Sequence, residues 1–348
     1  MLALTIAATV HISVLGSFHP VQFELQPALG QTLVVESHGR TEILQGERML
    51  PLTGPAKVNG RNGAMVHFRL AVPGGKPREY IGRLEVRRSG SELLAIVEMD
   101  RETAVAAIVE AEGAAGLPFE ARKAQAVVTR SYLAGAHNRH QGFDFCDTEH
   151  CQLMKGFAHS SSAGSRAALE TREKVLTYKG EIIPAMYSAN CGGHTKSLAQ
   201  TKWEGAAIPQ PGYPYFSVAC PLRGKASGHG VGMCQMGAID IARHGYPAQI
   251  ILGHYFPGTT VEAVAMATPK AAAVSQSQIS AVPAVHPHAA RLVHVAGVAH
   301  AAGIAHAASV SHVASAAYAA GAVHSPSAAH AASATLTASA GTGARAAQ

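Results

Sequence analysis

The sequence has few charged residues and no long apolar run. Of its 348 residues, 14% are charged and 47% are hydrophobic, which suits a globular protein with an alanine-rich appendage better than a charged disordered chain. No stretch of 18 apolar residues occurs, so we expect no membrane-spanning segment. Residues 1–16 are apolar but contain no Lys or Arg. They lack the charged start of a secretory signal, and we expect a β-strand there.

Several familiar fingerprints are also missing. The sequence contains no phosphate-binding or dinucleotide-binding glycine loop and no GxSxG nucleophile elbow, which argues against nucleotide-binding proteins and serine hydrolases of those kinds. The net charge of +6 suggests an anionic environment such as a cell envelope. The Lys and Arg residues are scattered rather than clustered, so we do not expect nucleic acid as a partner.

The chain divides into three parts of different pattern. Residues 1–99 contain short alternating runs separated by Gly and Pro turns, typical of strands with one buried face. Residues 100–267 mix helical and strand-like segments, and we expect an α+β fold with a cleft. The buried positions expected in the first two strands are Val10, Ile12, Val14, Val21, Phe23 and Leu25.

Residues 268–348 form an Ala/His-rich segment of low complexity with almost no charge, and we expect it to be disordered. Its histidines recur every six residues over much of its length, from His288 to His330, with Tyr318 in one place of the series. This spacing fits neither one helical face nor a parallel β-helix. Repeat expansion of a flexible tail is one explanation, and multivalent binding to metal or a surface is the other.

An apolar helical stripe ends in a carboxylate near residue 112. Val105, Ile108 and Val109 share one face of a helix expected from about residue 101, and Glu112 continues that face. A carboxyl group at the end of such a stripe is partly removed from water, as a general acid requires. Glu112 could equally be a solvated surface residue, and Glu110 or Glu102 fits the same argument.

A second helix is expected after Pro118. Lys123 and Arg130 stand two turns apart on its mostly buried stripe. Such cations either extend to solvent and pair with nearby carboxylates, or they line a cleft that faces Glu112.

The densest group of metal-binding residue types lies in HNRHQGFDFCDTEHCQ. Thiolate and imidazole at this spacing can close a tetrahedral zinc site, which would be structural because four protein ligands leave no open position. A disulfide between Cys146 and Cys151, or two buried thiols, is the alternative. A pairing of Cys191 with Cys220 also stays open. The candidate zinc ligands are Cys146, His150, Cys151 and His140.

Two glycine-rich loops carry polar side chains. They are SANCGGHT and GHGVGMCQMGA, and glycine lets the backbone approach a ligand closely. Both could also be ordinary turns. The candidate ligand-binding residues in and beside them are Ser188, His194, His229 and Gln235.

These segments, taken in order, resemble the SpoIID/LytB family, the stage II sporulation protein D and amidase enhancer family. The run EGAAGLPFEARKAQAVVTRSY is similar to its pattern of a Glu-Met-Pro turn followed by Glu-Ala-x-Lys-Ala-Gln-Ala-Val and Arg-x-Tyr. The later blocks FDFCDTEHCQ, SANCGGHT, KW at 202–203, PYFSVAC, GHGVGMCQMGA and HYFPGT follow in the family's order. The resemblance extends from about Asp100 to Thr260.

The resemblance implies an extracytoplasmic lytic transglycosylase that acts on peptidoglycan glycan strands stripped of stem peptides, usually by an N-acetylmuramoyl-L-alanine amidase. The family's catalytic Glu falls on Glu112. Its conserved helix residues fall on Lys123, Gln125 and Arg130, which we expect to contact substrate. Some members bind zinc through a cluster that corresponds to the four ligands named above.

The sequence departs from the family pattern at three places. The Met-Pro after the catalytic Glu is Gly113-Ala114, the family's Trp is Leu117, and the common Ser before Gln235 is Cys234. A looser turn after Glu112 is the expected consequence. Two other kinds of function stay open: a glycan-binding amidase activator without catalysis, and a structural envelope protein that works through its His-rich tail.

Overall fold

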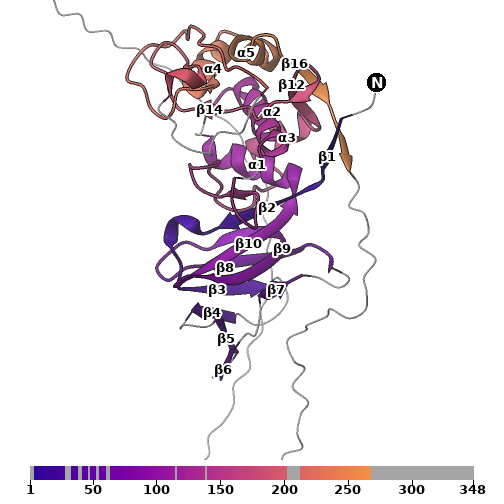
Figure 1. The fold of residues 1–348 in the computed structure, drawn as a ribbon, viewed down its shortest axis with the longest axis vertical. Helices are drawn as coiled ribbons and strands as arrows, with labels where there is room; N and C mark the ends of the chain where they lie inside the picture. The colour runs from indigo at the N-terminus through magenta and orange to yellow at the C-terminus, as the bar shows by residue number, and fades with distance from the viewer. Residues whose placement is uncertain are drawn as a thin grey trace, which may run out of the picture. The chain divides into compact units, whose positions relative to one another are not determined.

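The computed structural model describes residues 4–27, 33–37, 41–45, 48–51, 55–59, 63–113, 116–137, 139–201 and 212–267 (Figure 1). These residues form helices and several β-sheets, which confirms the α+β class. The predicted tail at 268–348, the KW pair at 202–203 and Ala114 lie outside the described residues. None of the helices in the described ranges is long and apolar enough to cross a membrane.

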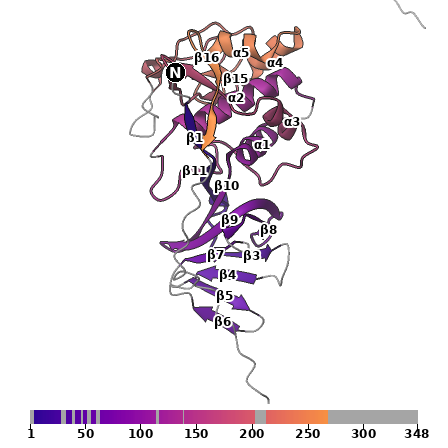
Figure 2. The same cartoon turned by 90° about the vertical axis from the view of Figure 1, so that its right-hand side faces the viewer.

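The N-terminal part of the chain forms most of a ten-stranded sheet, whose strands lie side by side in Figure 2. Its order is β11-β2-β10-β9-β8-β3-β4-β5-β6, and β7 pairs with β9. The strands are β2 (Thr9–Val14), β3 (Gln22–Pro27), β4 (Leu33–Ser37), β5 (Thr41–Gln45), β6 (Arg48–Pro51), β7 (Ala56–Val58), β8 (Val66–Ala71), β9 (Arg78–Ser89), β10 (Glu92–Asp100) and β11 (Phe145–Cys146).

Alternation along the first strands predicted their buried face correctly at five of six positions. Val10, Ile12, Val14, Phe23 and Leu25 are buried. Val21 is 55% exposed, because it lies in the bend before β3 rather than in the strand itself. The prediction for Val21 was therefore wrong.

The helical part begins where the sheet strand β10 ends. Asp100 caps α1 (Arg101–Glu112) by accepting a hydrogen bond from the Thr103 N–H at 3.0 Å, which satisfies one of the free donors of the first turn. α1 packs against α2 (Phe119–Gly135) and α3 (Ala163–Glu170). The stripe of Val105, Ile108 and Val109 is buried as predicted. One core continues from the sheet into these helices.

Short sheets and two further helices complete the described chain. β12 (Lys174–Tyr178) and β13 (Glu181–Ile182) form a hairpin; both of its turn residues, Lys179 and Gly180, have positive φ, as a type I′ turn requires. β16 (Thr260–Ala263) also pairs with β12. The remaining elements are 3-10 turns Gly16–Phe18 and Leu198–Gln200, β14 (Tyr187–Ser188), β15 (Met233–Cys234), α4 (Gln235–Arg243) and α5 (Ala248–Tyr255).

Two strands from opposite ends of the described chain lie side by side. β1 (Thr5–Ala7) pairs in parallel with β17 (Ala265–Ala267), and Figure 1 shows the indigo and orange strands together. Ile6 is buried there against Val175 and Val264. The predicted domain boundaries at 99/100 and 267/268 stay predictions.

Candidate functional site

The three glutamates of α1 have different surroundings. Glu102 forms an ion pair with Arg130 at 2.7 Å. Glu110 accepts a hydrogen bond from the Gly164 N–H at 2.8 Å, in the first turn of α3. Glu112 accepts one from the Leu153 N–H at 3.1 Å and stays partly exposed. Glu102 and Glu110 therefore contact neighbouring helices, whereas Glu112 contacts the loop that contains Leu153.

A buried tyrosine and a buried glutamine adjoin Glu112. Burial raises the pKa of Tyr187 well above its usual value, and the nearby charge of Glu112 adds to the effect. Tyr187 thus stays a neutral hydrogen-bond donor. Within the described ranges, neither its hydroxyl nor the Nε2 of Gln125 has a partner of good hydrogen-bond geometry. A buried polar group left unpaired costs about 1–3 kcal/mol, and at a site this is explained by water or a polar ligand.

The two predicted glycine-rich loops come together beside Tyr187. β14 and β15 pair in parallel, with Tyr187 opposite Met233 and Ser188 opposite Cys234. Gln235 follows directly and is half-buried. Ser188 is buried, and its hydroxyl has no partner among the described residues. The loops therefore bring Ser188 and Gln235 to the strand pair that carries Tyr187.

His229 is held in its neutral form. Its Nδ1 accepts a hydrogen bond from the Val231 N–H at 3.0 Å, which requires the proton to sit on Nε2. Burial lowers the pKa of His229, and a backbone interaction with Tyr187 opposes the shift. His194 is exposed and bridges Ala219 in a short antiparallel contact. Of the two histidines, the structure brings only His229 to Tyr187.

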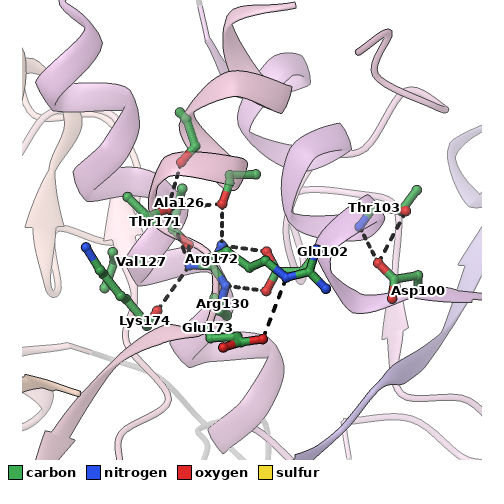
Figure 3. A network of polar contacts seen from close by, with 12 residues as sticks. Asp100, Glu102, Thr103, Ala126, Val127, Arg130, Thr171, Arg172, Glu173 and Lys174 are labelled. Carbon is green, nitrogen blue, oxygen red and sulfur yellow. Dashed lines mark hydrogen bonds and ion pairs between the residues drawn. The ribbon is translucent and has the colours of Figure 1, made fainter. Parts of the chain in front are cut away.

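Arg130 lies away from Glu112. Its side chain is fully buried and donates two hydrogen bonds of 2.7 Å to Glu102, with further bonds to the carbonyls of Ala168 and Lys174 (Figure 3). Glu102 and Glu112 are ten residues apart on α1, or about 15 Å at 1.5 Å per residue. With its donors engaged at the start of α1, Arg130 holds helices together and does not face the predicted acid.

Lys123 is also turned away from Glu112. Its Nζ lies 2.5 Å from Glu120 and 3.7 Å from Glu170 of α3. Two residues along a helix correspond to roughly 200°, which puts Lys123 and Gln125 on opposite sides of α2. Gln125 is the residue on the side of Glu112 and Tyr187.

The space beside Gly113, where the sequence departs from the family pattern, is filled by a side chain from another helix. A Cβ at this position would collide with the guanidinium of Arg122 and with the carbonyl oxygen of Val109. Arg122 is itself buried. The missing side chain after Glu112 is therefore matched by a buried Arg from α2, which offsets the looseness that the sequence suggested at this residue.

The predicted metal ligands form one cluster. The ligand atoms of His140, Cys146, His150 and Cys151 all lie within 4.8 Å of one another. His140 Nε2 lies 3.2 Å from Cys151 Sγ, and His150 Nδ1 lies 3.7 Å from both sulfurs. All cysteines are free thiols. A hydrogen bond with Cys151 lowers the pKa of Cys146, which favours the thiolate that binds metals.

The N-terminal sheet holds the loop that carries this cluster. Asp147 is buried and accepts hydrogen bonds from the backbone of Leu15 at 2.8 Å and from Arg78 at 3.0 Å. Asp144 accepts a hydrogen bond from the His11 N–H at 2.8 Å. The same loop then reaches Leu153, which donates to Glu112. The sheet, the metal-binding cluster and the candidate acid are thus joined in one chain of contacts.

The comparisons with known proteins point to one family. Residues 89–178 match the family model described as stage II sporulation protein, SpoIID. This part of the chain is similar to the SpoIID family, in agreement with the resemblance seen in its motifs. An uncharacterized protein of Brachyspira hyodysenteriae is 32% identical over 139 residues, 38% of this chain and 37% of its own length. The amidase enhancer of Bacillus subtilis is 33% identical over 90 residues, 26% of this chain and 12% of its own length.

The SpoIID match includes Glu112, Gln125 and the metal-binding cluster, and it ends before the glycine-rich loops. Sequence reasoning missed Tyr187, whose position immediately before SANCGGHT was the available signal. It also missed the backbone N–H of Leu153, which a sequence pattern cannot reveal because any residue supplies it. The glycine-rich loops therefore extend the site beyond the matched segment.

Proposed function

We propose that this protein is a peptidoglycan lytic transglycosylase that cleaves the MurNAc–GlcNAc β-1,4 bond of peptide-stripped glycan strands. One observation carries the proposal: the partly exposed carboxyl group of Glu112, held by the Leu153 N–H, lies beside the polar groups of Tyr187 and Gln125, which have no well-formed hydrogen bond among the described residues. We place its action in the cell envelope, outside the cytoplasm.

Cleavage of the glycosidic bond requires a proton on the leaving oxygen and a nucleophile at the anomeric carbon. Glu112 donates that proton. The sugar's own C6 hydroxyl then attacks the anomeric carbon and closes a 1,6-anhydro ring, while the Glu112 carboxylate accepts the proton of that hydroxyl. No second carboxylate is needed, which agrees with the engagement of Glu102 and Glu110 elsewhere. Neutral Tyr187 and Gln125 offer hydrogen bonds to oxygens of the sugar.

Replacing Glu112 with Gln tests this role. The Glu112→Gln variant keeps the shape and the bond from Leu153 but has no proton to exchange, so anhydro products should fall by at least the roughly 10²- to 10⁴-fold typical of acid–base catalysis. Mass spectrometry of amidase-treated sacculi measures the products. Glu110→Gln is the matched control and should keep activity. Wild-type turnover by Glu112→Gln would remove this carboxylate from the mechanism.

We also propose that zinc is the ion of the His140, Cys146, His150 and Cys151 cluster. Two thiolates and two imidazoles fit the donor preference of zinc, and a four-ligand site is structural. The ion would fix the loop that leads to Leu153, so its role is to hold that backbone donor near Glu112. Elemental analysis after purification without chelator should find zinc, and Cys146→Ser with Cys151→Ser should lose about one equivalent. Unchanged zinc content in that variant contradicts the assignment.

A second function is supported by the similarity to the amidase enhancer. In that case the surface around Glu112 would bind glycan, and the protein would stimulate a partner N-acetylmuramoyl-L-alanine amidase without cleaving sugar bonds. The purified chain alone, incubated with peptide-stripped strands, separates the two functions. A lytic transglycosylase releases anhydro sugars by itself, whereas an activator changes only the rate of an added amidase.

A further inference from the structure

A second group of sulfur atoms lies outside the metal-binding cluster described above. Cys191, Cys220 and Cys234 are all buried, and their sulfurs lie within 4.8 Å of one another. They come from three separate segments: the loop after β14, the segment that bridges His194, and the end of β15. Three buried thiols are thus brought together from segments that lie far apart in the sequence.

Hydrogen-bond donors point at these sulfurs. Cys234 Sγ accepts the N–H of Cys191 at 3.3 Å and the N–H of Gly237 at 3.4 Å. The second donor belongs to the first turn of α4, where the helix end favours negative charge. Cys220 Sγ lies 3.3 Å from the hydroxyl of Tyr255. Burial raises the pKa of Cys191 and Cys234, so a metal ion must displace the protons of these thiols, and the two N–H donors then stabilise the thiolate of Cys234.

The absence of a side chain at Gly237 leaves room for the sulfur of Cys220. A Cβ at Gly237 would collide with both Cys220 Sγ and the hydroxyl of Tyr255. The backbone of α4 therefore approaches the sulfurs more closely than any residue with a side chain allows. Beside Cys220, a groove of about 390 Å³ is lined by Ala219, Pro221, Ile241, Tyr246, Ile250 and His254.

A metal ion accounts for all three thiols, whereas a disulfide would use two and leave one. A disulfide requires a sulfur–sulfur distance near 2.05 Å. Zinc–sulfur bonds of about 2.3 Å with tetrahedral angles put neighbouring sulfurs roughly 3.8 Å apart, within the spacing observed here. We propose that Cys191, Cys220 and Cys234 bind one thiophilic metal ion, zinc or an ion of similar softness, as three thiolates. The fourth position faces Tyr255 or the groove.

The ion would join the loops of the candidate site. Ser188 lies opposite Cys234 in the β14–β15 pair, His194 follows Cys191 by three residues, and Gln235 follows Cys234. A three-thiolate site would therefore fix both glycine-rich loops at one point. This inference concerns metal binding and does not depend on whether the protein cleaves glycan.

Metal content of the full chain tests the proposal. The protein is produced with added zinc, purified without chelator and compared with two variants, Cys146→Ser/Cys151→Ser and Cys191→Ser/Cys220→Ser/Cys234→Ser. We expect about two zinc equivalents in the wild type and about one in each variant. Wild-type zinc content in the triple variant would overturn the proposal. So would a disulfide among the three cysteines, found by alkylation and peptide mass mapping without reductant.

Cobalt substitution keeps the test valid if the triple variant does not fold. Co²⁺ is added to Cys146→Ser/Cys151→Ser, in which the three thiols are intact. We expect a thiolate-to-cobalt charge-transfer band with the intensity of about three Co–S bonds. A spectrum without this band in the folded variant would overturn the proposal.

Discussion

Tyr187 is the neighbour of Glu112 whose contribution to catalysis can be isolated most cleanly, because its hydroxyl has no well-formed bond in the described structure. Tyr187→Phe should lower kcat about tenfold or more through loss of a donor to the transition state. The free energy of unfolding should stay the same or rise by up to about 1–3 kcal/mol, since the variant loses a buried hydroxyl that has no well-formed hydrogen bond. Product analysis and urea unfolding measure the two effects.

Tyr215 provides the matched control. It is buried as well, but its hydroxyl donates a 2.5 Å hydrogen bond to the Pro184 carbonyl. Tyr215→Phe should therefore cost about 1–3 kcal/mol of stability by leaving that carbonyl unpaired, with kcat unchanged. Equal loss of kcat in the two variants would mean that the Tyr187 effect is a general consequence of altering this core.

At the scale of elements, the Glu102–Arg130 pair joins α1 to α2, and Arg130 also reaches carbonyls at the end of α3. Glu102→Gln should destabilise the fold by about 3–5 kcal/mol, because it leaves a buried guanidinium without its counter-charge. Denaturant unfolding measures this. Adding Arg130→Met should recover part of the loss. Glu173→Gln is the control: its pair with Arg172 is exposed, and we expect at most about 1 kcal/mol.

The sequence predicted those elements whose signals are local. Helical periodicity predicted α1 and α2. The stripe shared by Lys123 and Arg130 was also correct, since both side chains point toward α3. Of the two alternatives for these cations, the structure supports pairing with nearby carboxylates rather than a cleft that faces Glu112. A helical period says which residues share a face, and tertiary packing decides what that face meets.

The sequence predicted only those parts of the site whose residues lie close together along the chain. Glu112 follows from its own helix, and the Cys-His cluster from spacing within one loop. Tyr187 reaches Glu112 across 75 positions of sequence, and the three thiols assemble from segments up to 43 positions apart. No spacing rule encodes such contacts, because they depend on how β14 and β15 pair.

At the scale of the whole described unit, the pair of His11 and Asp144 connects the N-terminal sheet to the loop that carries the candidate metal ligands. The hydrogen bond with Asp144 raises the pKa of His11 above 6.5, and Glu98 at 4.0 Å contributes. Burial opposes the shift at Asp144, but the bonds from His11 lower its pKa below 3.8. The pair therefore stabilises the fold most between about pH 4 and 6.5.

Stability from this pair should fall as pH rises through the raised pKa of His11, because the folded protein then loses a proton that it binds more tightly than the unfolded chain. The change should stay below about 1 kcal/mol, since both side chains are half exposed. Melting temperatures at pH 5.5 and 8.5 measure it, and Asp144→Asn should flatten the difference. The same slope in that variant would assign the pH response to other groups.

The pairing of β1 with β17 affects the order in which this protein can fold. A ribosome makes residues 5–7 first and residues 265–267 some 260 positions later, so the opening strand stays without its hydrogen-bonding partner for most of synthesis. Parallel pairing across so long a separation is slow to form. Final closure of the unit is therefore a late event, and chains interrupted before residue 265 should leave an open strand edge that invites aggregation.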